Sequence, residues 1–360
     1  MSGKAHNPKG WEPDAHERYF AAPKEVMDRY RELFSATDPH HNKTTYKEIQ
    51  EWRKRGESHA LGHYAYEQMY DIYAGIEDEL LEGAIDSHLH IYPDYVPRAV
   101  DIIQLAIEAS KAKMRAVVCK DHFFSSVGQA WAAQRVVDEM VRKEELEHAC
   151  QVFGTHILAW SHHPDQVQLI RKYPNLGAIF FYTFTGGVQA GPELPIVDDN
   201  GELLPDVKAC IEIAAENKIC IMTGHKSPDL AMALVKYCHE VDARVLVTHG
   251  SACSFGPGMS GSLEGAKEMA ELGAYLELNG NKWMPSIIWP IVDPNICLEF
   301  VQAVGAEHIV ANTDFGQVLV CDPIEGFRLF IRGMLHWGIS KEDIKTMIQT
   351  NPAKLLYLDD

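Results

Sequence analysis

The stretch Gly83-Ala84-Ile85-Asp86-Ser87-His88-Leu89-His90 decides the fold of this chain. Its short apolar run is typical of a buried strand, and its two histidines stand two positions apart. Because side chains alternate across a strand, His88 and His90 can point to the same side while Leu89 packs on the other. The stretch therefore predicts a first strand over residues 84–89 that ends in a pair of imidazoles able to bind a metal ion.

Seven similar apolar runs follow, separated by segments with the apolar spacing of helices. The expected later strands cover residues 115–119, 152–160, 178–182, 219–223, 244–248, 274–278 and 309–312. The expected helices include residues 98–111, 131–147, 206–216, 229–240, 263–272 and 295–304. Eight such units over about 275 residues have the size and rhythm of a (β/α)8 TIM barrel. The alternative, a doubly wound open sheet, usually carries a glycine-rich turn after its first strand, and this chain has none there.

Residues 1–80 differ from the barrel region, residues 81–360. They are polar and contain helix-period apolar residues such as Tyr46 and Trp52, which predict an N-terminal helical extension. We expect this arm to pack on a barrel or to form an oligomer contact, and the alternative is a lid over a neighbouring subunit's site. Its aromatic residues need a surface to pack against, which favours a homo-oligomer.

Charge and composition narrow the classes of partner. The chain has 33 basic and 51 acidic residues, a net charge of −18, which argues against binding nucleic acid or an anionic membrane. It has no apolar leader and no apolar run long enough to span a membrane. Its eight cysteines are scattered without a CxxC pair, as expected in a reducing compartment, so we predict a cytoplasmic protein with a small-molecule substrate.

Metal-ligand residue types also follow three later strands. Strand 5 leads into His225, strand 6 into His249 and strand 8 into Asp314. The carboxyl ends of barrel strands meet at one mouth, so these side chains are expected to converge on the HxH pair. Imidazoles with one carboxylate suit zinc or a similar divalent ion that keeps an open position for water.

On these motifs the chain resembles the amidohydrolase superfamily from its first strand to the C-terminus. In that family an HxH on strand 1, a histidine after strand 5, a histidine after strand 6 and an aspartate after strand 8 form the metal site. The resemblance implies one or two zinc ions at a site made by His88, His90, His225, His249 and Asp314.

One feature departs from the binuclear members, which carry a carboxylated lysine or a glutamate after strand 4. Residues 178–183 contain neither. Lys120, after strand 2, is the candidate substitute, and its alternative is a lysine paired with Asp121 or with the substrate. The number of metal ions is therefore open, and in a mononuclear site His249 would orient substrate instead of binding the ion.

The resemblance implies a metal-dependent hydrolase that uses a metal-activated water to cleave a small-molecule amide, cyclic amide, lactone or ester. Asp314 would act as general base and then acid, and His249 would help to polarise the scissile carbonyl. The alternative is a mononuclear, non-oxidative decarboxylase of an unsaturated or aromatic acid, and a non-catalytic assembly protein with a structural metal is a third. For substrate contacts we predict His122, Trp283 and Trp289, although ordinary packing would also explain the tryptophans.

Overall fold

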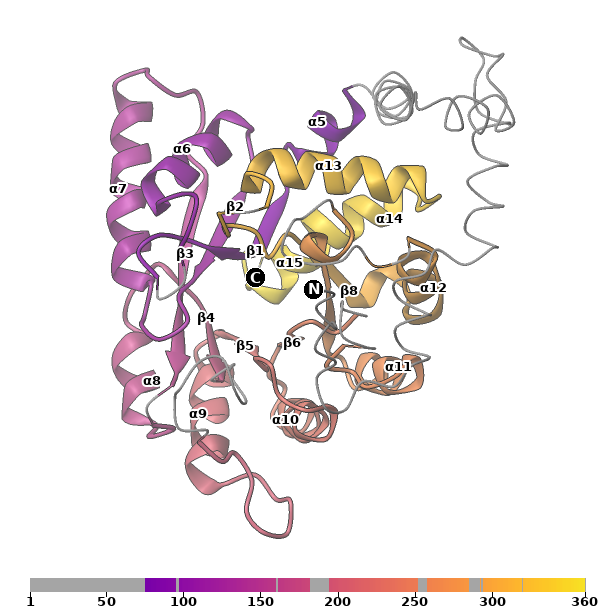
Figure 1. The fold of residues 1–360 in the computed structure, drawn as a ribbon. Helices are drawn as coiled ribbons and strands as arrows, with labels where there is room; N and C mark the ends of the chain where they lie inside the picture. Colours follow the sequence, from indigo (N-terminus) through magenta and orange to yellow (C-terminus); the bar gives the residue numbers. More distant parts are fainter. Residues whose placement is uncertain are drawn as a thin grey trace, which may run out of the picture.

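A computed structural model describes residues 75–94, 97–159, 161–181, 194–251, 258–284, 292, 294–318 and 320–359. Its centre is one sheet of eight parallel strands in sequence order (Figure 1). The strands are β1 (Ile85–His90), β2 (Ala116–Lys120), β3 (Gln151–Leu158), β4 (Leu176–Phe181), β5 (Cys220–Met222), β6 (Val245–Val247), β7 (Tyr275–Asn279) and β8 (Ile309–Asn312). All eight predicted strands are confirmed, and the fold is the predicted (β/α)8 barrel.

The sheet closes between β1 and the residues that follow β8. The backbone N–H of Asp314 donates to the carbonyl of His88 at 2.8 Å, and the N–H of His90 donates to the carbonyl of Phe315 at 2.8 Å. Leu89 and Phe315 form a parallel bridge between these two bonds. The closure of the barrel is thus made by the backbone of the residues predicted to hold the metal.

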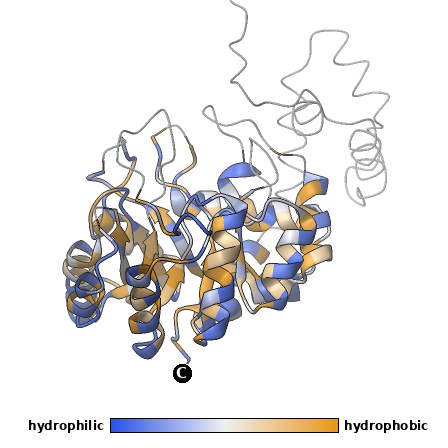
Figure 2. Ribbon diagram, turned by 90° about the horizontal axis from the view of Figure 1, so that it is seen from below, coloured by the Kyte–Doolittle hydropathy of each residue, from blue (hydrophilic) through white to orange (hydrophobic). Residues whose placement is uncertain are grey.

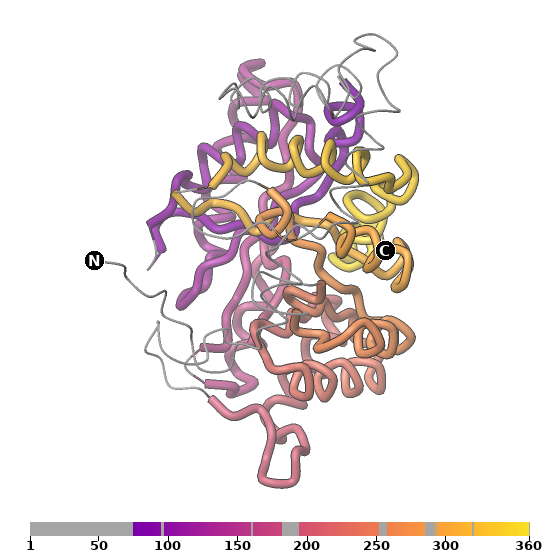
Figure 3. The backbone as a smooth tube through the Cα atoms, turned by 45° about the vertical axis from the view of Figure 1, so that its right-hand side comes forward, coloured from indigo at the N-terminus to yellow at the C-terminus, as the bar shows by residue number. Residues whose placement is uncertain are grey.

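A ring of helices covers the outside of the strands (Figure 1). They are α6 (Ile102–Lys111), α7 (Val127–Arg142), α8 (Asp165–Ile170), α9 (Pro205–Glu216), α10 (Pro228–Glu240), α11 (Leu263–Glu271), α12 (Pro294–Val304) and α13 (Pro323–His336). Local chemistry sets their starts: Asp101, Ser262 and Asp322 accept backbone N–H groups of the first turns of α6, α11 and α13. The loop before α9, closed by a bridge between Val197 and Leu203, projects beyond this ring (Figure 3).

The end of the expected N-terminal extension packs on the barrel. Residues Ile76–Leu81 form α5, which contacts α13 and α14 (Lys341–Lys345), with ion pairs from Asp78 to Arg328 at 2.6 Å and from Glu79 to Lys341 at 2.7 Å. These last residues of the extension therefore belong with the barrel. The remainder of the extension, residues 1–74, lies outside the described residues.

Apolar side chains form two layers. The first fills the barrel interior with residues such as Ile85, Val118 and Phe180. Leu355 of α15 (Asn351–Leu355) packs against these interior residues. The second lies between the strands and the helices. Hydrophobic and hydrophilic residues alternate along the outer helices (Figure 2). The short elements η1 (Gly280–Lys282), η2 (Ala306–His308) and η3 (Thr346–Thr350) complete the chain. In the described part, no helix is both long and apolar enough to cross a membrane.

Candidate metal centre

Two imidazoles and one carboxylate converge at the carboxyl end of the barrel. The Nε2 atoms of His88 and His90 lie 3.3 Å and 3.2 Å from the same oxygen, Oδ1 of Asp314. All three residues are buried. Ligands held about 2.0–2.2 Å from zinc at a near-tetrahedral angle are themselves roughly 3.3 Å apart. The spacing of these atoms therefore fits a divalent metal ion.

A bulge in β1 makes this convergence possible. Ile85 pairs with Ala116 of β2, whereas His90 pairs with Lys120, and β1 has one extra residue between these points. Ile85 faces the barrel interior, and strict alternation from it would turn His88 and His90 towards the helices. The extra residue reverses the alternation, so that the two histidines face the interior and Leu89 packs outward.

Glu277 of β7 orients the first of these histidines. Its Oε1 and Oε2 lie 3.0 Å and 3.1 Å from Nδ1 of His88, and Oε2 also accepts the backbone N–H of His249 at 2.9 Å. The carboxylate therefore holds the proton of His88 on Nδ1 and leaves the lone pair of Nε2 facing Asp314. This carboxylate–imidazole arrangement is the usual support of a metal-binding histidine.

His249 and His225 extend the cluster across the mouth. Nε2 of His249 lies 3.8 Å from Oδ2 of Asp314, and its Nδ1 lies 2.6 Å from Oδ1 of Asn279. The ring of His225 lies 4.5 Å from that of His249, centroid to centroid. The structure thus brings together all five residues that the resemblance implied, with His225 placed beside His249.

The electrostatic environment favours the protonation states that a metal site needs. Burial and the charge of Lys282 lower the pKa of His249 to about 4, and burial with the neighbouring His249 holds the pKa of His225 well below its usual range. Burial alone would raise the pKa of Asp314, but His88, His90 and Lys282 outweigh it and hold that pKa far below its ordinary value. Neutral imidazoles beside an ionised carboxylate are the form in which these ligands bind metal.

The backbone is strained at two of these residues. Seven described non-glycine residues have positive φ, and five of them follow helix ends, where a left-handed residue is common. The other two are His249, at 51°, and Asp314, at 52°, each the second residue after a strand. Such conformations cost about 1–3 kcal/mol each and cluster at functional sites.

Lys120 lies inside the barrel behind the histidines. Its Nζ is 3.9 Å from Oε1 of Glu277 and 5.3 Å from the centre of the Phe180 ring. Burial lowers the pKa of this lysine, partly against the effect of Glu277. Asp121, its expected alternative partner, instead accepts the backbone N–H groups of Phe123 and Phe124. The ion pair is with Glu277, and a carboxylated, metal-bridging Lys120 stays a prediction.

His122 lies on the outer side of His90. The two rings stack 4.5 Å apart with an interplanar angle of 1°, and Nδ1 of His122 is 2.7 Å from Oδ2 of Asp94. Arg98 donates to the same oxygen at 2.8 Å and 2.6 Å. His90, Asp94 and His122 are close enough to form a second metal cluster, but Oδ2 of Asp94 already accepts hydrogen bonds from Arg98. Asp94, Arg98 and His122 therefore hold the ring of His90 in place through the stacked ring of His122.

The two tryptophans predicted to contact substrate have different outcomes. Trp283 is 2% exposed and packs in the outer core, with its ring 6.1 Å from that of Trp337. The structure thus favours the packing alternative for Trp283. Trp289 lies outside the described residues.

The segment from Glu277 to Lys282 was missed as part of the site. Asn281 donates to Oδ2 of Asp314 at 2.7 Å, and Nζ of Lys282 lies 3.7 Å from that oxygen. Asn279 donates to Oε2 of Glu277 at 3.1 Å. A signal was available: Glu277, Asn279 and Asn281 are polar residues at alternate positions in and directly after a buried strand, which is the spacing of one strand face.

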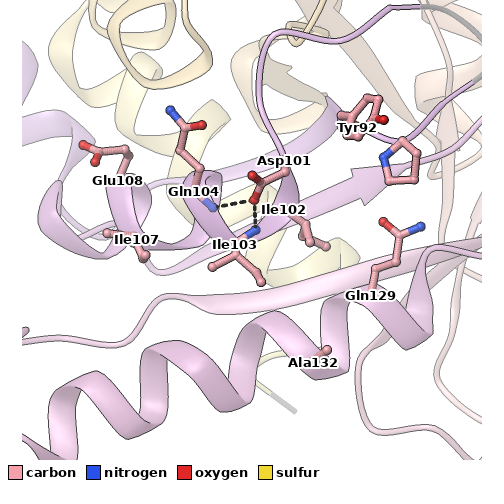
Figure 4. Close-up of a pocket in the computed structure, with 10 residues that line it drawn as sticks. Tyr92, Asp101, Ile102, Ile103, Gln104, Ile107, Glu108, Gln129 and Ala132 are labelled. Carbon is pink, nitrogen blue, oxygen red and sulfur yellow. Dashed lines mark hydrogen bonds between the residues drawn. The ribbon is translucent and has the colours of Figure 1, made fainter.

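A separate groove of about 740 Å³ lies between α6 and α7, beside the loop after β1 (Figure 4). Its lining is mostly apolar and includes Tyr92, Ile103 and Ile107. Asp101, also in its wall, caps α6 through the two hydrogen bonds drawn there. No imidazole lines the groove, so it is distinct from the metal cluster.

The fold places this chain among (β/α)8 barrels, and several solved structures of enzymes have the same fold. An amidohydrolase from Pseudomonas aeruginosa matches with a TM-score of 0.53 and 12% identity over 78% of this chain and 98% of that chain. A probable dipeptidase from the same organism matches at 0.52 and 12%, over 78% and 96%. A probable 2-pyrone-4,6-dicarboxylic acid hydrolase from Acinetobacter baumannii matches at 0.50 and 12%, over 76% and 99%.

At identities this low the likenesses show the fold alone, a (β/α)8 barrel shared with these enzymes. A more particular assignment comes from sequence. The profile of DUF6282, a family of unknown function, matches residues 83–277, more than half of the chain. The chain therefore belongs to the DUF6282 family. No curated protein matches the sequence.

Proposed function

We propose that this protein is a metal-dependent hydrolase of a small-molecule amide, cyclic amide, lactone or ester. The observation that carries the proposal is the convergence of two buried imidazoles, His88 and His90, on one oxygen of Asp314. The buried carboxylate of Glu277 behind His88 supports a metal-binding role, because a merely structural histidine has no need of this orientation.

The donor set fits a divalent ion, and zinc is our first choice. His88, His90 and Asp314 would hold it, with His225 and His249 completing the site. When bound, such an ion would polarise a substrate carbonyl and lower the pKa of bound water towards about 7. One ion is the simpler proposal, because β4 contains no lysine or glutamate to bridge two.

Asp314 is placed to move a proton. Its Oδ1 faces the HxH pair, while its Oδ2 faces Asn281 and His249. We propose that Oδ2 accepts the proton of the attacking water and later delivers it to the leaving group. The hydrogen bond from Asn281 holds this carboxylate in one orientation.

The tautomer of His249 supports a ligand role. Its Nδ1 faces the carbonyl oxygen of the Asn279 amide, whose NH₂ group donates to Glu277 and to Asn312. Nδ1 therefore carries the proton, and Nε2, turned towards Asp314, has a lone pair and no hydrogen. A lone pair can bind a cation, whereas polarising a substrate carbonyl by a hydrogen bond would need a proton there.

Non-oxidative decarboxylation is the second candidate. The absence of a bridging residue in β4 is compatible with a mononuclear site, and the same residues could hold the ion for that reaction. The two reactions differ in their products, because hydrolysis consumes water and cleaves the substrate, whereas decarboxylation releases carbon dioxide.

Metal analysis, followed by a screen of amides, lactones, esters and carboxylic acids, tests the proposal. We expect the wild type to bind zinc stoichiometrically and His88→Ala/His90→Ala to lose it. Asp314→Asn should still fold, since asparagine tolerates a left-handed backbone, and the four histidines should keep the ion, but turnover should fall by about 10²–10⁴-fold. An Asp314→Asn enzyme with the wild-type rate would contradict the proton-transfer role, and carbon dioxide as product would favour the second candidate.

We also propose a cytoplasmic, homo-oligomeric protein. The seven cysteines in the described part are all free, which supports a reducing compartment. Light scattering of the purified full chain would give the number of subunits, and a monomer at micromolar concentration would contradict the oligomer.

A further inference from the structure

Lys282 stands at the rim of the metal cluster on a fixed piece of backbone. It ends η1, which is tied to the exit of β8 by a hydrogen bond from the N–H of Asn281 to the carbonyl of Thr313 at 3.0 Å. The carbonyl of Lys282 itself accepts the N–H of Val292 at 2.8 Å. The side chain is 12% exposed, so its ammonium is held near the cluster instead of reaching into bulk water.

The two oxygens of Asp314 divide the site into two sides. Oδ1 faces Nε2 of His88 and of His90, which is the side proposed for the ion. Oδ2 faces Nζ of Lys282 at 3.7 Å. Lys282 therefore lies beside Oδ2, the oxygen to which the proposed mechanism assigns proton transfer to and from the substrate.

Three ion pairs lie around the cluster, in addition to the buried carboxyl of Asp86. Glu277 faces Lys120, Asp94 faces Arg98, and Asp314 faces Lys282. A divalent ion bound to Asp314 adds two positive charges to these balanced pairs, in a buried setting where charge is weakly screened. Asp314, which would lie between the ion and the ammonium of Lys282, offsets only one of their three positive charges, so a further anion beside Lys282 would be favourable.

We propose that Lys282 forms an anion-binding subsite and that the substrate carries a carboxylate next to the bond that reacts. This inference rests on the proposed metal site and adds the chemical class of the substrate. The ammonium would contact the carboxylate while the ion engages the reacting group. The acidic surface of the whole chain does not oppose this, because a buried cation and a metal ion dominate the potential within the mouth.

Calorimetry with defined probes tests the subsite. Zinc-loaded wild type is titrated with glutarate and with its neutral diamide, glutaramide, and so are Lys282→Met and Lys282→Arg. We expect the wild type to prefer glutarate and Lys282→Met to bind glutarate about 10- to 100-fold more weakly, since a charge-assisted hydrogen bond is lost. Glutaramide binding should not change. Lys282→Arg should keep most of the preference, and Lys111→Met, an exposed lysine at the end of α6, should behave as wild type.

A zinc titration of each variant without any probe separates the two proposals. Lys282→Met should bind zinc at least as tightly as the wild type, because it removes a like charge from beside the ion; a misfolded variant would bind it more weakly. A wild type that binds no zinc would contradict the proposed function. Normal zinc binding without a preference for glutarate, or with the preference intact in Lys282→Met, would overturn the anion subsite alone.

Discussion

Replacing Glu277 by glutamine should weaken zinc binding although Glu277 is not proposed to touch the ion. The glutamine would keep its carbonyl oxygen where Oε2 now accepts two donors, the N–H of His249 and the amide of Asn279. Its NH₂ group would then face Nδ1 of His88 in place of Oε1. Because two N–H donors repel, we expect His88 to move its proton to Nε2, the atom that faces Asp314.

The magnitude follows from two separate losses. Loss of the carboxylate support of a metal-binding histidine lowers metal affinity by about 10- to 100-fold, or roughly 1.4–2.7 kcal/mol. The change also leaves the ammonium of Lys120 buried without its carboxylate, and breaking a buried pair in this way costs about 3–5 kcal/mol of folding stability. The Glu277→Gln/Lys120→Met double variant should therefore regain stability but keep the weak zinc binding.

Zinc affinity is measured by competition with a chelating dye, stability by urea denaturation, and the His88 tautomer by NMR of ¹⁵N-labelled histidine. Glu271→Gln, on the exposed face of α11, is the matched control and should change none of these. Wild-type zinc affinity in a folded Glu277→Gln variant would refute the orienting role. Recovery of affinity in the double variant would show that instability alone had weakened the binding.

Two further predictions concern the barrel itself. Gly316→Ala should lower the free energy of unfolding by at least about 3 kcal/mol, because Gly316 has φ +119° and an added Cβ would lie 1.9 Å from the carbonyl oxygen of His90 at the barrel closure. Gly201→Ala is the control, with φ +82° but nothing within 4 Å of the added Cβ. It should lower that free energy by only about 1 kcal/mol, measured by the same urea denaturation. Burial and the charge of Lys226 lower the pKa of His162 from 6.5 to about 4. Between pH 6.5 and pH 4 the unfolded chain therefore binds a proton at this residue that the folded chain does not bind. The free energy of unfolding should fall as the pH drops through this range. His162→Gln should remove roughly 2 kcal/mol of that fall, the full shift being reduced by about half for solvent screening, whereas exposed His163→Gln should leave the profile unchanged.

The strands were predictable because strands buried on both faces are short apolar runs, and residues 219–223 and 244–248 contain β5 and β6 as expected. The ends of the helices were harder to predict than the strands. Helix α7 ends at Arg142 instead of residue 147, because Glu144 adopts a left-handed conformation with φ 62°. The six-residue helix α8 is too short to show a helical period, so no bounds for it could be predicted from the sequence.

Within the site, the ligand residues were predictable but their supports were not. The motif spacing identified His88 and His90, yet simple alternation from Ile85 would have turned them outward, and the bulge that corrects this has no signal in the sequence. Glu277 contacts His88 across 189 positions of sequence. Only the closed barrel brings these two side chains together, so a reading of local patterns could not pair them.

The closure of the barrel and the formation of the metal cluster are one structural event. The hydrogen bonds that join β1 to the exit of β8 involve the backbones of His88, His90 and Asp314, whose side chains form the cluster. Asp314 reaches the mouth only with its strained, left-handed backbone, and its N–H bond to His88 holds that conformation. A bound ion would link the side chains across the same seam that the backbone closes. Metal binding and barrel stability are therefore thermodynamically coupled, because an ion that binds only the closed barrel must stabilise it.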